Sequence, residues 1–219
     1  MPAYEKPPAF AGGCLFIGYK YIKATVNGNT VEVKNISAHD ISTALNSENA
    51  TKEIKVYCSK IAGVEVTKVN LQLSSLKAVA RSEANELKVI MNSGSVTMDK
   101  DALTYVTENA KGSSVTLVIE DAEESNLNEA QKETIQAEEK LVAVIDTYIL
   151  SDSAKLKELG GNTVTLTMSD TIIRHYDPVT LHVIEIRADG TRREISFHIE
   201  DGKIVFDADY LSTYMIVRD

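Results

Sequence analysis

Residues that could do chemistry are few in this chain, and none of them falls into a recognised catalytic or metal-binding spacing. The four histidines are His39, His175, His182 and His198. His182 and His198 could become neighbours across a hairpin and bind zinc with one or two carboxylates, but the spacing typical of zinc sites is missing. On a strand, His198 falls on the polar side and is most simply a solvent-facing residue. We therefore predict no metal site.

Nucleophile and phosphate-binding motifs are missing from the sequence as well. It contains no G-x-S-x-G turn that would support a Ser–His–Asp arrangement. The glycines in AGGCLFIG and LGGNT lack the Lys and Ser/Thr of a phosphate-binding loop and the spacing of a dinucleotide fingerprint. Paired carboxylates for glycoside cleavage are imaginable but unsupported. We predict no catalytic residue, no cofactor and no enzymatic activity, and an enzyme with an unrecognised cleft remains the residual alternative.

Tyr210 and Tyr214 are the weak candidates for a binding site. On one strand, two residues four apart share a face, so these rings could form an aromatic platform for a sugar. We favour the alternative, in which a tyrosine near the last strand packs over the core edge and tethers its hydroxyl to the backbone. Further tyrosines that could supply stacking surface are Tyr19, Tyr21, Tyr57, Tyr105, Tyr148 and Tyr176.

Cys14 and Cys58 are the two cysteines of the chain. Without C-x-x-C spacing or a second pair, they are too few for a disulfide framework. In an oxidising compartment they could pair, which would add roughly 3–4 kcal/mol in the chain-entropy model. Cys58 alternates with Ile54 and Val56 in IKVYC, which predicts a small buried hydrophobe instead. Both alternatives stay open.

The composition excludes several classes of partner. Of the 219 residues 43% are apolar, enough for a sizeable core, and the formal net charge is −9. Such a chain lacks the clustered Lys and Arg that neutralise phosphates, which argues against nucleic acid and anionic lipid as partners. No run reaches about 18 apolar residues, so we predict no membrane insertion. The opening MPAYEKPPAFAGGC has no apolar signal-peptide core, and we predict a lead or linker over 1–18.

Turn residues and hydrophobic alternation predict a β-rich module with short helices over 19–125. An Asn-Gly turn separates YKYIKATV from TVEVK, and ELKVIMNSGSVTMD predicts a second hairpin. Helices are predicted in SAHDISTALNSE, after a capping Ser74 or Ser75, and after Asp99. Further strands are predicted in EIKVYC, VEVTKVNLQL and SSVTLVIE.

The segment 126–140 interrupts this pattern and is rich in acids, which predicts an acidic linker or a surface helix. The rest, 141–219, is an antiparallel β module with Asp-Gly pairs at its turns. In REISFHIE, Ile195, Phe197 and Ile199 alternate with polar residues, so these three should face the core. The expected fold class is mainly β with minor α+β character: antiparallel β-sandwich-like modules with two or three short helices.

The segment DPVTLHVIEIRADGTRREISFHIEDGKIVFDADYLSTYMIV resembles the closing module of many long cell-surface proteins of Gram-positive bacteria. That module typically ends in a pattern of the type v.F.tdHfStYaiv. The matching residues in this chain are Val205, Phe206, Asp209, Leu211, Ser212, Thr213, Tyr214, Ile216 and Val217. Tyr210 stands where the family usually has His, so no role of that His carries over. Upstream, VNLQLSSLKAVARSEANELKVIMNSGSVTMDKDALTYV and NLNEAQKETI are similar to other segments of the same proteins, and the resemblance covers about 64–219.

The resemblance implies an extracellular, multi-domain context at the cell surface or in the cell wall, and no catalytic residue. We therefore expect a non-catalytic module of a bacterial cell-surface protein that acts as a structural spacer or presentation scaffold. Its partners would be the neighbouring domains of a longer protein, and the missing signal peptide would reflect excision from a precursor. The alternative is an adhesin-like binding module that recognises a host or cell-wall glycan or protein.

Overall fold

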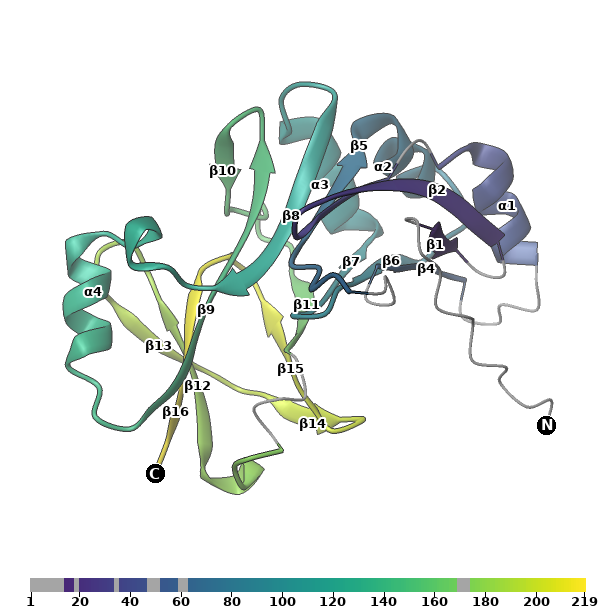
Figure 1. The fold of residues 1–219 in the computed structure, drawn as a ribbon. Coiled ribbons are helices and arrows are strands. Elements are labelled where there is room, and N and C mark those ends of the chain that lie inside the picture. The colour runs from purple at the N-terminus through teal and green to yellow at the C-terminus, as the bar shows by residue number, and fades with distance from the viewer. Residues whose placement is uncertain (1–13, 18–19, 34–35, 47–51, 59–62, 169–173) are drawn as a thin grey trace.

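The computed structural model describes residues 14–17, 20–33, 36–46, 52–58, 63–168 and 174–219, with the backbone alone for 14–17, 20–23 and 46. In this part of the chain, strand pairing continues without interruption through 16 strands (Figure 1). The strands form two mixed sheets, and the chain passes from one sheet to the other at two places.

The strands of the first sheet are, in spatial order, β1 (Cys14–Ile17), β4 (Glu53–Tyr57), β6 (Glu86–Ile90), β7 (Gly94–Asp99), β11 (Val164–Met168), β15 (Lys203–Ala208) and β14 (His198–Glu200). Those of the second sheet are β3 (Thr30–Val33), β5 (Lys68–Gln72), β8 (Ser114–Asp121), β9 (Leu141–Ser151), β16 (Thr213–Arg218), β12 (Leu181–Ile186) and β13 (Arg192–Ile195), with β10 (Ala154–Leu156) on β9. β2 (Lys20–Asn27) pairs with both β1 and β3 and so joins the sheets. At the opposite margin, β13 leads directly into β14.

The described helices are α1 (Ala38–Asn46), α2 (Leu73–Ala80), α3 (Lys100–Asn109) and α4 (Glu129–Gln136), with single 3₁₀ turns η1 (Glu124–Asn126) and η2 (Pro178–Thr180). α1, α2 and α3 lie together, α1 against β4, α2 against β5 and β8, and α3 against β6 and β7. α4 lies apart from them, beside β12 and β13 (Figure 1). The β-rich α+β class is confirmed. The helix count of two or three was too low, and β3–β5 and β4–β6 are parallel pairs where we expected antiparallel ones.

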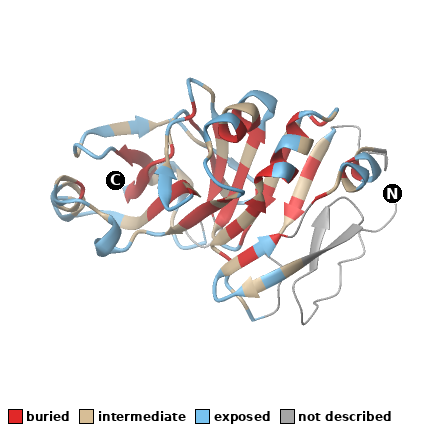
Figure 2. Ribbon diagram, turned by 90° about the horizontal axis from the view of Figure 1, so that it is seen from above, coloured by how far each residue is buried: buried red, intermediate tan, exposed pale blue. Residues whose placement is uncertain are grey.

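A single large hydrophobic core contains residues from both predicted modules, from Val31 to Ile216 (Figure 2). β8 pairs with β9, and β7 pairs with β11, so strands from either side of 126–140 are hydrogen-bonded to each other. The 126–140 segment itself contains α4, which begins with a capping box between Asn128 and Gln131. The acidic segment therefore does not separate two cores in the described structure.

Several local predictions are confirmed with small shifts. The first hairpin forms, but its two-residue turn is Gly28-Asn29, one position later than expected. Asp99 caps α3, its Oδ1 accepting the Ala102 N–H at 2.8 Å. The predicted serine cap of α2 is wrong, because Gln72 is the N-cap and makes no side-chain cap bond.

The serine at position 75 has another role: its hydroxyl lies buried inside α2 and accepts the backbone N–H of Ile36 at 2.8 Å. In VEVTKVNLQL the strand is shorter than predicted and covers Lys68–Gln72 alone. The predicted lead over 1–18 falls partly outside the described residues, and Cys14–Ile17 is strand β1 and not linker. β1 pairs with β2 and β4, which explains why this stretch is extended.

The segment REISFHIE is two strands and not one. β13 pairs with β12, whereas β14 pairs with β15, and Ser196 and Phe197 connect them. Because the chain changes partner here, the two halves do not present the same face to one core. Ile199, which alternation placed inward, is 40% exposed.

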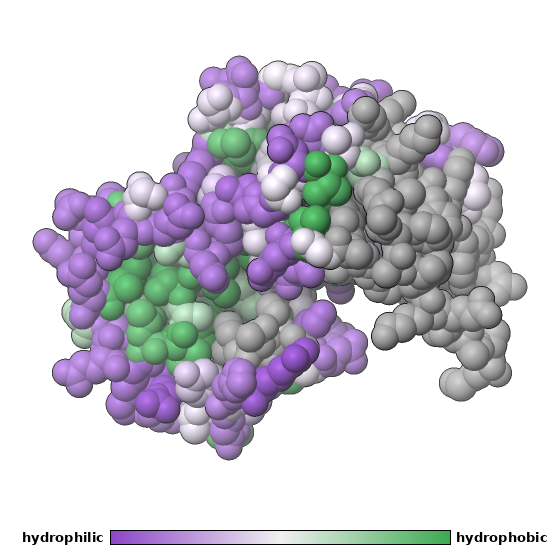
Figure 3. Space-filling model, viewed as in Figure 1, coloured by the Kyte–Doolittle hydropathy of each residue, from purple (hydrophilic) through white to green (hydrophobic). Residues whose placement is uncertain are grey.

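The face of the second sheet next to α4 carries its own small apolar cluster. Its buried members are Ile184, Ile186, Met215 and Val217, and Ile135 of α4 packs against them. Figure 3 shows this area as a hydrophobic surface bordered by hydrophilic residues. β12 and β16 are thus buried on both faces, which explains why their sequences are nearly continuous apolar runs.

Candidate functional site

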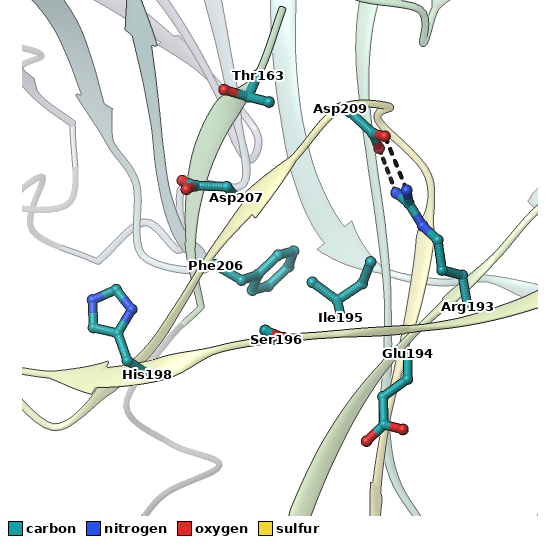
Figure 4. A pocket seen from close by; sticks show the side chains of 9 residues that line it. All are labelled: Thr163, Arg193, Glu194, Ile195, Ser196, His198, Phe206, Asp207 and Asp209. Carbon is teal, nitrogen blue, oxygen red and sulfur yellow. Dashed lines mark hydrogen bonds and ion pairs between the residues drawn. The ribbon is translucent and has the colours of Figure 1, made fainter.

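A concavity of about 410 Å³ lies where β13, β14 and β15 meet, at the margin where the chain passes between the sheets. Ile195 and Phe206 supply its apolar side chains (Figure 4). The other lining residues are Thr163, Arg193, Glu194, Ser196, His198, Asp207 and Asp209. We take this concavity as the candidate site because it brings a histidine, a serine, an arginine and three carboxylates together around an apolar floor.

Arg193 closes one side of the concavity by linking two carboxylates. Its Nε donates to Glu185 Oε2 at 2.6 Å, and its two terminal nitrogens donate to the two carboxylate oxygens of Asp209. This paired hydrogen bond raises the pKa of Arg193 and lowers the pKa of Asp209 from its usual range. Three of the five N–H donors of Arg193, and its charge, are thus directed at carboxylates of the same chain.

Glu185 is the buried member of this cluster, with 0% of its surface exposed. Its Oε1 makes no hydrogen bond and lies 3.5 Å from Arg187 Nε, so charge alone compensates that oxygen. Tyr214 lies on the same side of the sheet, and its pKa is raised by burial first and by the Glu185 charge second. The cluster is therefore an ion-pair network at the side of the concavity, with one buried carboxylate, Glu185, and a partly exposed Arg193.

The remaining polar groups of the concavity are not assembled for nucleophilic catalysis. Asp207 Oδ1 accepts the Thr165 hydroxyl at 2.7 Å. In the described structure no hydrogen bond connects Ser196, His198 and Asp207 to one another, so no base is placed to activate the serine hydroxyl. What the arrangement offers is a shallow polar surface with an apolar floor.

A second concavity, of about 360 Å³, lies near Glu65, Glu120, Asp121 and His175. Glu120 is already engaged there, accepting the Tyr148 hydroxyl at 2.8 Å and pairing with Lys68 at 2.7 Å. Among the described residues, no group of three or more His, Cys, Asp or Glu side chains is arranged to hold a metal ion. This hollow therefore shows no cation-binding geometry.

The two candidate tyrosines do not form an aromatic platform. Tyr214 is completely buried and packs against Phe206 with the rings tilted by 59° and their centroids 4.9 Å apart, while its hydroxyl donates to the carbonyl of Tyr210 at 2.7 Å. Tyr210 lies before β16 and is half-buried, with Arg187 over its ring at 5.8 Å. The described tyrosine side chains are all buried or half-buried: Tyr57, Tyr105, Tyr148, Tyr176, Tyr210 and Tyr214.

The polar residues between the two tyrosines are likewise bound inside the protein. Ser212 donates its hydroxyl to the Ile186 carbonyl at 2.9 Å, and Thr147 donates to the Ser212 carbonyl at 3.0 Å. Thr213 donates to Asp146 at 3.2 Å. These bonds connect β16 to β12 and to β9, so these polar groups of the YLSTY segment hold neighbouring strands together.

Cys58 is buried and forms no disulfide within the described residues, and burial raises the pKa of its thiol. The side chain of Cys14 lies outside the described residues, so the pairing of the two cysteines stays a prediction. A buried thiol with a raised pKa is chemically unreactive.

His182 and His198 lie in different sheets and do not come together as a zinc pair. His182 instead has a carboxylate at each ring nitrogen: Glu194 is 2.8 Å from Nδ1 and Asp219 is 2.9 Å from Nε2. Both contacts raise its pKa. The sequence analysis predicted neither these contacts of His182 nor the Glu185–Arg193 ion pair. An acidic residue at a core-facing position of LHVIEI, Glu185, could have indicated that it needs a partner of opposite charge.

No protein-family model and no curated protein matches this chain. No helix in the described ranges is both long and apolar enough to cross a bilayer.

Proposed function

We propose that this chain is a non-catalytic structural module of a bacterial cell-surface protein, located at the cell surface or in the cell wall and acting as a spacer or presentation scaffold. The observation that carries the proposal is that polar groups of the YLSTY segment bond to other groups of the same chain. The hydroxyl groups of Ser212, Thr213 and Tyr214, which would be natural binding or catalytic groups of the chain's most distinctive motif, are hydrogen-bonded within the fold.

The position of β16 supports a mechanical role. This strand pairs with β12 on one side and β9 on the other, so backbone hydrogen bonds secure both of its edges. A strand held on both sides resists detachment better than one at a sheet margin.

Location can be tested with an antibody to the folded chain on cells of the organism that expresses it. We expect labelling of intact cells and its loss after mild surface proteolysis. Labelling that requires permeabilised cells would contradict the proposed location.

The adhesin-like alternative can be tested with the same purified chain against mucin, matrix proteins and isolated cell-wall polysaccharide, repeated at raised salt. The spacer proposal predicts no saturable binding. Salt-resistant, saturable binding to one of these would favour a recognition module. The half-buried state of the described tyrosines is the reason that we place this alternative second.

A further inference from the structure

We propose that the exposed edge of β14 pairs with the same edge of a second copy of this chain, in an antiparallel two-fold contact centred on Ile199. β14 is one end of the strand order and pairs with β15 on one side. Its other side has no strand partner among the described residues. All three of its residues, His198, Ile199 and Glu200, are exposed.

The turn next to β14 determines which backbone groups point to this edge. Glu200 pairs with Lys203 across Asp201-Gly202, and both turn residues have positive φ (50° and 70°), as in a two-residue type I′ hairpin. In such a turn, the two residues on either side of it are hydrogen-bonded to each other. Because successive residues of a strand direct their N–H and C=O groups to opposite sides, those of Ile199 point away from β15. Ile199 therefore has one donor and one acceptor available at the edge.

The side chains of β14 are complementary to themselves in an antiparallel pairing about Ile199. The two copies of Ile199 would exchange two backbone hydrogen bonds. His198 of each copy would lie opposite Glu200 of the other, a close cross-strand pair of opposite or hydrogen-bonding character. Ile199, one of three exposed large apolar residues in the described structure, would be covered by its own copy.

The other unpaired strand edges do not offer this match. A similar pairing of β10 would place Lys155 opposite itself, and that lysine is already 3.1 Å from Asp146. At β13, Arg193 is engaged with Glu185 and Asp209 of its own chain. β14 thus combines an available backbone edge, an exposed apolar side chain and charge complementarity.

The contact is small and should be weak. Three residues from each copy bury far less than the roughly 1,200–2,000 Å² of stable interfaces, so we expect a dissociation constant of about 0.1–1 mM. The net charge of −9 on each copy opposes association. About 0.15 M salt, with a Debye length near 8 Å, screens that repulsion. This inference does not depend on the proposed function.

The test is sedimentation equilibrium of the whole chain from about 0.01 to 1 mM in 0.15 M salt. Ile199→Pro removes the outward N–H and no hydrogen bond of the monomer, so it should weaken dimerisation at least ten-fold. His198→Glu places two acids opposite each other and should do the same. Val179→Ser, at another exposed apolar residue that is 87% exposed, is the matched control and should leave association unchanged.

A mixing experiment separates this contact from a general loss of folding. His198→Glu and Glu200→Arg should each associate less than wild type alone. In an equimolar mixture the introduced acid lies opposite the introduced arginine at one cross-strand position and the wild-type His198–Glu200 pair is kept at the other, which should restore the dimer. Restoration supports the proposal. A monomeric wild-type chain up to 1 mM, a dimer that Ile199→Pro does not affect, or a mixture that stays monomeric would overturn it.

Discussion

At the scale of single residues, the polar groups with the strongest interactions all act within the fold. Tyr214, Glu185 and Ser212 are buried and bond to groups of the same chain. Their variants should therefore change stability. Three predictions follow from the geometry of individual side chains.

The first concerns Tyr214→Phe, which keeps the ring against Phe206 and removes the hydroxyl that donates to the Tyr210 carbonyl. Loss of one buried hydrogen bond should lower the free energy of unfolding by about 1–2 kcal/mol. Denaturant unfolding measures this. Tyr105→Phe is the control, because the Tyr105 hydroxyl has no hydrogen bond within the described structure. An equal loss of stability in both variants would show that the hydrogen bond of the Tyr214 hydroxyl does not stabilise the fold.

The second concerns the ion-pair network at the side of the concavity. Arg193→Met leaves the buried Glu185 without its 2.6 Å partner, which should cost about 2–4 kcal/mol, less than for a fully buried pair because the Arg193 side chain is 40% exposed. Adding Glu185→Gln removes the uncompensated charge and should recover part of that loss. If the double variant were as unstable as the sum of the two single variants, the pair would not be coupled.

The third concerns pH. The neighbours of His182 raise its pKa above the ordinary value of 6.5, since only the protonated ring can donate to both Glu194 and Asp219. The stabilisation is fully present below pH 6.5 and is lost as the pH rises through the folded-state pKa. Its size should be a few tenths of a kcal/mol, because these side chains are exposed and screened.

Unfolding free energies of wild type and His182→Gln between pH 5 and 8 test this. The difference between the two proteins should shrink as the pH rises. A difference that grows with pH would show that the sign of the linkage is wrong.

At the scale of elements, hairpins were predictable and long-range pairings were not. Asn-Gly and Asp-Gly turns favour local strand pairs, and the hairpins at 27–30 and 200–203 are confirmed. The parallel pairs β3–β5 and β4–β6 and the pairing of β7 with β11 join segments far apart in sequence, and alternation does not encode which strand lies next to which.

The candidate site was predictable only in part, for a related reason. The sequence favoured an internal tether for Tyr214, which is what the structure contains. It did not place Arg193 near Asp209, because that contact depends on where β13 leaves β12 and how the chain returns after β15. The prediction that Ile199 faces the core was wrong, because hydrophobic alternation does not show where a chain changes its pairing partner.

Gly94 provides a prediction at this scale, because it allows β7 and β11 to approach closely. A Cβ at this position would lie 2.1 Å from the Thr167 carbonyl oxygen. Gly94→Ala should force the strands apart and lower the unfolding free energy by about 2 kcal/mol or more. Gly161→Ala has open space around it, so it should lose only the roughly 1–2 kcal/mol that a positive φ (86°) costs an alanine, less than the loss at Gly94. Equal losses, measured by thermal melting, would contradict the close approach.

At the scale of the whole molecule, the large hydrophobic core and the continuous strand order both include residues before and after 126–140. The 141–219 segment alone would lose the β8 partner of β9 and the β7 partner of β11. We therefore expect the chain to unfold as a single cooperative unit, and the proposed structural role predicts that it does so without a cofactor.

Differential scanning calorimetry of the whole purified chain, before and after treatment with a chelator and with added divalent metal or nucleotide, tests this claim most directly. The account predicts one transition, with equal calorimetric and van't Hoff enthalpies, at a temperature that none of these additions changes. Two separated transitions would contradict the single unit, and a transition that shifts with metal or nucleotide would contradict the cofactor-free structural module.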